Sequence, residues 1–178
     1  MSAVVLSPHT DDAIFSLGEH LCAQAGVTVV APLAGIPADP AGRRKHQTLW
    51  AEHARAMAII GARYVNGPFL DDVYPPPDRG IFDAWLTLQL ADAETVYIPL
   101  GIKHVDHVLV SNAAIARVLT HRPPTVRFYA ELPYSTRYLH HARERRELIE
   151  RLMGEYASQT DDALIAELLV PEQIWELS

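Results

Sequence analysis

Cysteine is nearly missing from this chain of 178 residues, in which Cys22 is the single one. One cysteine cannot form an internal disulfide, so we expect a protein of a reducing compartment, the cytoplasm. Cationic side chains are also in the minority, with 15 lysines and arginines against 22 aspartates and glutamates and a formal net charge of −7. Nucleic acid is therefore not an expected partner.

Long apolar runs and several well-known catalytic signatures are missing as well. No window approaches the roughly 18 apolar residues that span a membrane, and the first ten residues lack the basic start of a secretory signal. The chain has no G-x-S-x-G elbow, no phosphate-binding P-loop and no G-x-G-x-x-G. These absences argue against a membrane protein, a serine hydrolase, a P-loop nucleotidase and a dinucleotide enzyme.

The composition is that of an ordinary globular protein, with 49% hydrophobic and 21% charged residues. The length suits one domain with a sizeable core, and we expect residues 1–178 to form a single domain. Short β-rich runs alternate with longer helical patterns along the chain. This alternation predicts an α/β fold with a mainly parallel sheet and helices on both faces.

The hydrophobic patterns predict the positions of these elements. Strands are expected at residues 3–6, 27–32, 62–66, 95–100 and 125–132. Helices are expected at residues 12–24, 48–60, 81–91, 107–121, 143–156 and 161–169. Residues 33–47, rich in proline and glycine, are expected to form a loop. Ligands of parallel sheets bind beyond the carboxyl ends of the strands, which directs attention to the segments that follow each strand.

Two polar clusters follow the first and the fourth predicted strand. They comprise His9, Asp11 and Asp12 in "SPHTDD" and His104, Asp106 and His107 in "GIKHVDH". Capping of the following helix accounts for one of the two adjacent aspartates but not for the other, nor for the histidine. Because parallel strands end at the same edge of a sheet, we expect the two clusters to meet.

Histidine and carboxylate together are suitable ligands for a divalent ion such as zinc. A catalytic zinc site uses about three protein ligands and leaves one position open. His9, Asp12 and His107 meet this count. An ion held by them would lower the pKa of a water molecule toward about 7 and make hydroxide available at neutral pH.

The remaining residues of the two clusters suit the other tasks of a hydrolase. Asp11 is a free carboxylate that could take a proton from the water, and His104 could stabilise the developing oxyanion. Asp106 is placed to orient His104 or His107. The other six histidines are interpreted as solvated or helix-face residues; they are His20, His46, His53, His121, His140 and His141.

The two motifs resemble those of a known enzyme family, the PIG-L/LmbE-like N-acetylglucosaminyl deacetylases. "LSPHTDDAIFSLGEHL" resembles the PHxDD segment that opens these proteins, and "PLGIKHVDHVLV" resembles their HxDH segment. Between them, "EHARAMAIIGARYV" is similar to the family's E-x-x-x-A-x-x-x-(L)-G helix and the strand after it. "FYAELPY" is similar to a strand end in one branch of the family, so the resemblance runs from about residue 3 to residue 134.

The resemblance implies a Rossmann-like α/β metalloenzyme, usually dependent on zinc. Its expected reaction is hydrolysis of an N-acyl group, usually N-acetyl, from an amino sugar, a glycoconjugate or a similar small metabolite. Carried over residue by residue, His9, Asp12 and His107 would be the metal ligands, Asp11 the general base and His104 the oxyanion stabiliser. Iron(II) suits the same ligands as zinc.

Three positions depart from the family's pattern. Thr10 replaces its commonest proline, Leu49 stands where many members carry an arginine, and Ile102 stands where some have a tyrosine. None of these is an expected ligand, so the departures concern the substrate. Five further residues are candidates for substrate contact: Asp71, Asp72, Arg43, Glu131 and Tyr134.

Two alternatives remain open at this point. One keeps the metal but changes the reaction, to amide hydrolysis of a non-sugar conjugate or to phosphoester cleavage. The other is a non-catalytic relative that binds metal or sugar. The oligomeric state, the sugar and the acyl group are not determined by these patterns.

Overall fold

The computed structural model describes residues 2–121, 123, 125–133 and 174–176, and the structural statements below concern these residues. They form a six-stranded sheet in the order β3-β2-β1-β4-β5-β6. The strands are β1 (Ala3–Leu6), β2 (Val27–Ala31), β3 (Arg63–Asn66), β4 (Thr95–Pro99), β5 (Thr125–Tyr129) and β6 (Ile174–Glu176). The helices are α1 (Asp12–Cys22), α2 (Pro40–Ile60), α3 (Arg79–Leu90) and α4 (Val105–His121).

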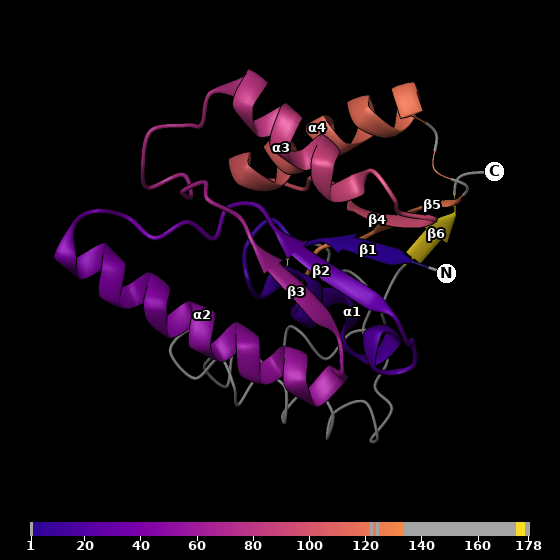
Figure 1. Cartoon of the computed structure of the whole chain (residues 1–178), viewed down its shortest axis with the longest axis horizontal. Helices are drawn as coiled ribbons and strands as arrows, with labels where there is room; N and C mark the ends of the chain where they lie inside the picture. The colour runs from indigo at the N-terminus through magenta and orange to yellow at the C-terminus, as the bar shows by residue number, and fades with distance from the viewer. Residues whose placement is uncertain (1, 122, 124, 134–173, 177–178) are drawn as a thin grey trace.

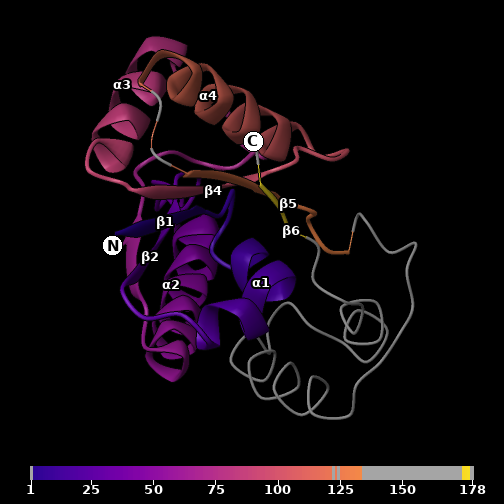
Figure 2. The ribbon, with the colours of Figure 1, turned by 90° about the vertical axis from the view of Figure 1, so that its right-hand side faces the viewer.

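The sheet is parallel except at one edge. Strand β1 pairs in parallel with β2 and β4, β2 with β3, and β4 with β5, whereas β6 runs antiparallel to β5. Helices α1 and α2 cover one face of the sheet, and α3 and α4 cover the other (Figures 1 and 2). The predicted α/β fold with a mainly parallel, doubly covered sheet is confirmed.

The core has two halves, one on each face of the sheet. Val5 on β1 packs with α1 and α2, while its neighbours Val4 and Leu6 pack with α3 and α4. Successive side chains of a strand point to opposite faces, so a central strand with both faces covered must be apolar throughout. This is why β1 reads as an unbroken apolar run.

Helix α2 begins earlier than its apolar pattern predicted. The side chain of Asp39 caps it by accepting a hydrogen bond of 2.8 Å from the backbone N–H of Gly42, and Pro40 occupies the first turn. Both features are typical of a helix start. The loop predicted at residues 33–47 is therefore wrong over residues 40–47, and Arg43 lies on the helix. The helix ends at Gly61, with φ of 77°, as expected.

The far end of the chain was only partly anticipated. Strand β6 was not predicted, because its three residues make too short a pattern to recognise. The helices predicted at residues 143–156 and 161–169 lie outside the described residues. No helix among the described residues is both long and apolar enough to cross a membrane.

Candidate metal centre and its cavity

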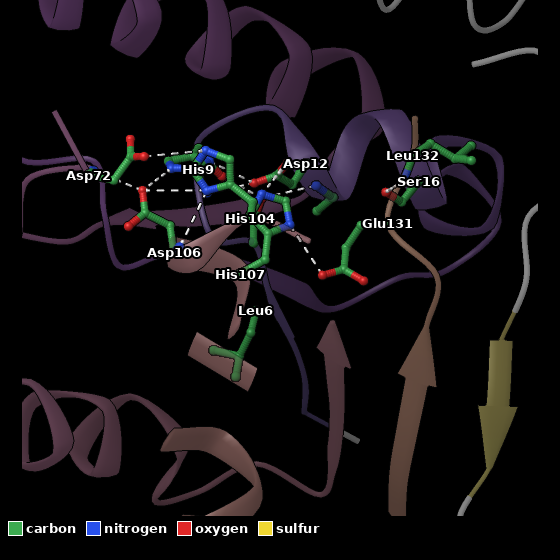
Figure 3. A network of polar contacts seen from close by, with 12 residues as sticks. Leu6, His9, Asp12, Ser16, Asp72, His104, Asp106, His107, Glu131 and Leu132 are labelled. Atoms are coloured by element: carbon green, nitrogen blue, oxygen red, sulfur yellow. Dashed lines mark hydrogen bonds and ion pairs between the residues drawn. The ribbon is translucent and has the colours of Figure 1, made fainter. Parts of the chain in front are cut away.

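The two polar clusters meet at the carboxyl edge of the sheet. Strands β1 and β4 are direct parallel neighbours, so the segments after them emerge side by side. The imidazole rings of His9, His104 and His107 lie with their centroids 5.2 to 5.4 Å apart (Figure 3). Residues almost a hundred positions apart in the chain thus share one site.

His9 stands between two carboxylates. Its Nδ1 lies 3.2 Å from Oδ2 of Asp12, and its Nε2 lies 2.8 Å from Oδ2 of Asp106. Burial would lower the pKa of His9, but the hydrogen bonds with Asp106 and Asp12 outweigh it and raise the pKa well above its usual value. The negative charge of the two carboxylates therefore favours a cation at His9.

Asp12 connects His9 to His107. Its Oδ1 lies 3.3 Å from Nε2 of His107, and its Oδ2 also accepts a hydrogen bond of 2.8 Å from the backbone N–H of His9. Burial would raise the pKa of Asp12, but the hydrogen bond with His9 and the neighbouring imidazoles lower it below its usual value. One potential ligand atom from each of these three residues lies within 4.8 Å of the other two.

The donors of this group fit a divalent ion of the zinc or iron(II) type. Two imidazoles and one carboxylate match the preference of these ions for nitrogen and oxygen ligands. His9, His104 and Asp106 form a second group, whose potential ligand atoms also lie within 4.8 Å of one another. In the first group each histidine has a carboxylate behind its other ring nitrogen, which is the usual arrangement for metal-binding histidines.

Glu131 is the carboxylate behind His107. Its Oε1 lies 3.2 Å from Nδ1 of His107 and accepts hydrogen bonds from the backbone N–H groups of Gly101, at 2.8 Å, and Ile102, at 3.3 Å. The residue is completely buried, on the side of His107 away from Asp12 (Figure 3). This geometry does not support the interpretation of Glu131 as a substrate contact. Instead, Glu131 holds the ring of His107 in position.

Asp106 takes the corresponding position behind His9. It also lies beside His104, one of the two positions that the sequence suggested, with its Oδ2 4.0 Å from Nδ1 of His104. Its Oδ2 accepts from Nε2 of His9 and also, at 3.0 Å, from the backbone N–H of Asp72. Burial would raise the pKa of Asp106, but the hydrogen bond with His9 lowers it. Asp106 thus links the loop after β3 to the centre.

Asp11 has a carboxylate that the fold does not use for capping. It occupies the N-cap position of α1, yet its side chain makes no capping hydrogen bond. Instead, Oγ of Ser7 accepts the hydrogen bond from the N–H of Ala13, at 2.9 Å. Burial and the neighbouring charge of Asp12 raise the pKa of Asp11 to about 7. A carboxylate with such a pKa, facing a cavity, is suited to proton transfer.

His104 also lines the cavity. Its Nδ1 accepts a hydrogen bond of 3.3 Å from the backbone N–H of Asp106, so a neutral ring carries its proton on Nε2. That Nε2 lies 3.8 Å from Oδ2 of Asp72. The ring is 29% exposed, so its N–H can reach a molecule in the cavity.

A cavity of about 400 Å³ opens over this centre. Asp71 and Asp72, two of the candidate substrate contacts, line it. Arg43 does not, because its guanidinium turns back to donate to the carbonyl of Ala38. Its neighbour Lys45 lines the cavity instead. The remaining candidate, Tyr134, lies outside the described residues.

Comparison with known proteins gave matches among solved structures alone. No family model matches the chain, and no curated protein matches it. A triple mutant of a deacetylase of the teicoplanin biosynthetic pathway superposes with a TM-score of 0.80 at 22% identity, covering 99% of this chain and 97% of that one. N,N'-diacetylchitobiose deacetylase from Pyrococcus horikoshii superposes with a TM-score of 0.73 at 16% identity, covering 99% and 83%. This chain has the deacetylase fold.

The same fold also occurs in an enzyme of another kind. The 4-carboxy-2-hydroxymuconate hydratase GalB from Pseudomonas putida superposes with a TM-score of 0.67 at 16% identity, covering 94% of this chain and 83% of that one. The deacetylase fold therefore does not define the reaction by itself. The reaction has to be argued from the residues of the site.

Within this deacetylase fold, α2 contributes residues that the sequence interpretation missed. His46 is buried, 3.8 Å from Oδ2 of Asp71, and lines the cavity together with Trp50. His46, Leu49, Trp50 and His53 follow the i, i+3, i+4, i+7 spacing of one helix face. Because this face begins with a histidine, a search for apolar periodicity does not detect its first residue. His46 does lie on a helix face, but the interpretation of it as solvated is wrong, because it is buried.

His53, one turn further along α2, is another buried histidine that was expected to be solvated or on a helix face. Its Nδ1 lies 2.8 Å from Oδ1 of Asn66, and its side chain has no exposure to solvent. Burial lowers the pKa of His53 to about 4, and the hydrogen bond with Asn66 opposes only part of this shift. The folded protein therefore keeps this ring neutral down to about pH 4.

His53 is expected to make the protein less stable as the pH falls from 7 to 5. The unfolded chain takes up a proton near pH 6.5 and the folded one only near pH 4, so acid favours unfolding across this window. The contribution lost is roughly 2 kcal/mol, at about 1.4 kcal/mol per pKa unit. Denaturant unfolding of metal-free protein at both pH values should show this loss, and His53→Phe should abolish that part of it. An equal loss in the variant would contradict the assignment.

Proposed function

We propose that this protein is a metal-dependent amide hydrolase that removes an N-acyl group, most simply N-acetyl, from an amino sugar or a similarly small conjugate. The observation that carries the proposal is a group of two histidines and one carboxylate next to a second carboxylate, which makes no capping hydrogen bond and has a raised pKa. His9, Asp12 and His107 form the group, and Asp11 is the carboxylate beside it. The deacetylase fold and the sequence resemblance support the same reaction.

His9, Asp12 and His107 would hold the ion in this proposal. When bound, zinc or iron(II) would supply Lewis acidity that polarises the amide carbonyl and acidifies a water molecule. Asp106 and Glu131 accept from the second ring nitrogen of His9 and His107 respectively, which fixes the orientation and tautomer of both rings.

The residues that face the cavity carry the proton transfers. Asp11 accepts the proton of the attacking water at its carboxylate and is placed to return it to the leaving amine. His104 donates its Nε2–H toward the oxygen of the tetrahedral intermediate, since its Nδ1 is already an acceptor. Asp71 and Asp72 offer carboxylate oxygens to hydroxyl groups of a sugar.

One alternative has an observation of its own. The hydratase with the same fold means that addition of water to a carbon–carbon double bond is a competing reaction class. The two reactions differ in their products, because amide hydrolysis releases a carboxylic acid and an amine.

The proposal can be tested by following acetate and free amine. Protein stripped with a chelator and then reloaded with zinc(II) or iron(II) is incubated with N-acetylglucosamine, N,N'-diacetylchitobiose and a non-sugar N-acetylamine. We expect metal-dependent release of equal amounts of acetate and amine, fastest from the sugars. Release from the non-sugar amide alone would assign a different amidase. Stoichiometric metal with no release from any of these amides would refute the hydrolase and leave a hydratase or a binding protein.

A further inference from the structure

Part of the cavity lining, called the wall below, is apolar. Besides Ala34 and Val73, six lining residues share this character: Phe15, Leu33, Leu49, Trp50, Leu132 and Pro133. They come from four separate places, namely α1, α2, the segment that follows β2 and the segment that follows β5. Two members of the metal-binding group, His9 and Asp12, line the same cavity.

Trp50 is held in a fixed orientation on this wall. Its indole Nε1 donates a hydrogen bond of 2.6 Å to the carbonyl of Ala34, which is itself 3% exposed. The single polar atom of the side chain is therefore satisfied by the protein. What the indole leaves for a bound molecule is apolar ring surface, held rigid so that little conformational entropy is lost on binding.

Leu49 extends the apolar surface next to Trp50 and lines the cavity as well. A guanidinium at this position would bring a positive charge to the wall, and leucine brings none. Lys45 is the one lysine or arginine that lines the cavity among the described residues, and its residue is exposed at the start of α2. Among the described residues, the wall thus has no fixed cation that would bind a phosphate or carboxylate of the substrate.

We propose that this wall binds an apolar group, aromatic or alkyl, carried by the substrate next to its N-acyl amine. The inference rests on the proposed hydrolysis and narrows its substrate class to conjugates that combine a hydroxylated part with an apolar one. Transfer of apolar surface from water to the wall favours such a substrate over a purely polar sugar. The apolar group could be the aglycone of a glycoside or a long N-acyl chain, and binding measurements separate the two.

The first measurement compares two glycosides that contain no amide and so cannot be hydrolysed by the proposed reaction. Titration calorimetry of zinc-loaded wild-type protein with phenyl β-glucoside and methyl β-glucoside gives the two dissociation constants. We expect the phenyl compound to bind about tenfold more tightly, a factor typical of modest apolar contacts in a pocket. A second pair, N-octanoyl- and N-acetylglucosamine, is compared in Asp11→Asn protein to prevent turnover.

Variants of the wall residues test whether a preference for the apolar ligand of a pair depends on the wall. Leu49→Gln and Trp50→Ala should each reduce the ratio of the two constants to about threefold or less. Leu119→Gln on α4 is the matched control, because Leu119 is 66% exposed on the other face of the sheet, and it should keep the full ratio. Leu49→Gln tests the proposal even if Trp50→Ala disturbs folding, since a polar side chain of similar size replaces the leucine.

The outcomes separate this inference from the proposed reaction. A preference in the first pair assigns the wall to an aglycone, and a preference in the second pair assigns it to the acyl chain. Equal binding within both pairs, or a preference that survives Leu49→Gln and Trp50→Ala, overturns the inference even if the protein releases acetate. A wall-dependent preference in a protein that releases no acid from any amide refutes the hydrolase and leaves the apolar site.

Discussion

Asp11→Asn is expected to slow amide hydrolysis by about 10³-fold, within the range of 10² to 10⁴ usual for a lost general base. Asparagine keeps the size of the side chain but cannot accept a proton at neutral pH. Metal content should stay at the wild-type level, because Asp11 is not one of the grouped ligands. Steady-state rates and metal analysis of the same preparation provide the two readouts.

Asp83→Asn is a suitable control for this experiment. Asp83 pairs with Arg79 on the surface of α3, and its removal should leave both rate and metal unchanged. A rate within about threefold of wild type for Asp11→Asn would be outside the general-base range and would refute the role.

The same substitution should stabilise the metal-free protein above pH 7. The pKa of Asp11 is raised from 3.8 to about 7 in the folded state, so the folded chain holds a proton that the unfolded chain has already released. The contribution of Asp11 to the free energy of unfolding is fully present below pH 3.8 and is lost as the pH rises through 7. Asparagine cannot ionise and should avoid this loss. A catalytic group that costs stability in this way is typical of active sites.

His107→Ala is expected to abolish metal binding and, with it, amide hydrolysis. The wild-type protein should retain about one zinc or iron ion per chain after gel filtration, as for a single site with three ligands. With one imidazole removed, His9 and Asp12 alone should lose the ion. Plasma mass spectrometry of both proteins measures this directly, and circular dichroism checks that the variant is folded.

Glu131→Gln provides a graded comparison for this result. Glutamine can still accept hydrogen bonds from Gly101 and His107 but carries no negative charge, so the ligand stays in place with a less basic imidazole. A loss of about 10- to 100-fold in metal affinity is expected from removal of such a support. His121→Ala, an exposed histidine at the end of α4, should bind like wild type. Full metal in His107→Ala would refute the ligand set.

Much of the fold could be predicted from local patterns. The five parallel strands and the alternation with helices were evident because the central strands β1, β2 and β4 are largely apolar on both faces and each helix has one apolar side. The start of α2 was misjudged, since Asp39 and Pro40 begin a helix whose first two turns are largely polar. Strand β6 was missed, because an edge strand of three residues depends on pairing with β5 and not on its own pattern.

The sequence by itself determined the chemistry available to this protein: two histidine- and aspartate-rich segments, each following a strand, and hence a divalent metal as the expected partner. The roles of single carboxylates were decided only by the tertiary structure. Asp106 supports His9, and Glu131 supports His107. The side chain of Asp11 makes no capping hydrogen bond, because Oγ of Ser7 accepts from the N–H of Ala13 instead. Hydrogen-bond partners depend on distances of a few ångströms between separate loops. Those distances are set by the register of β1, β4 and β5, which no local pattern encodes.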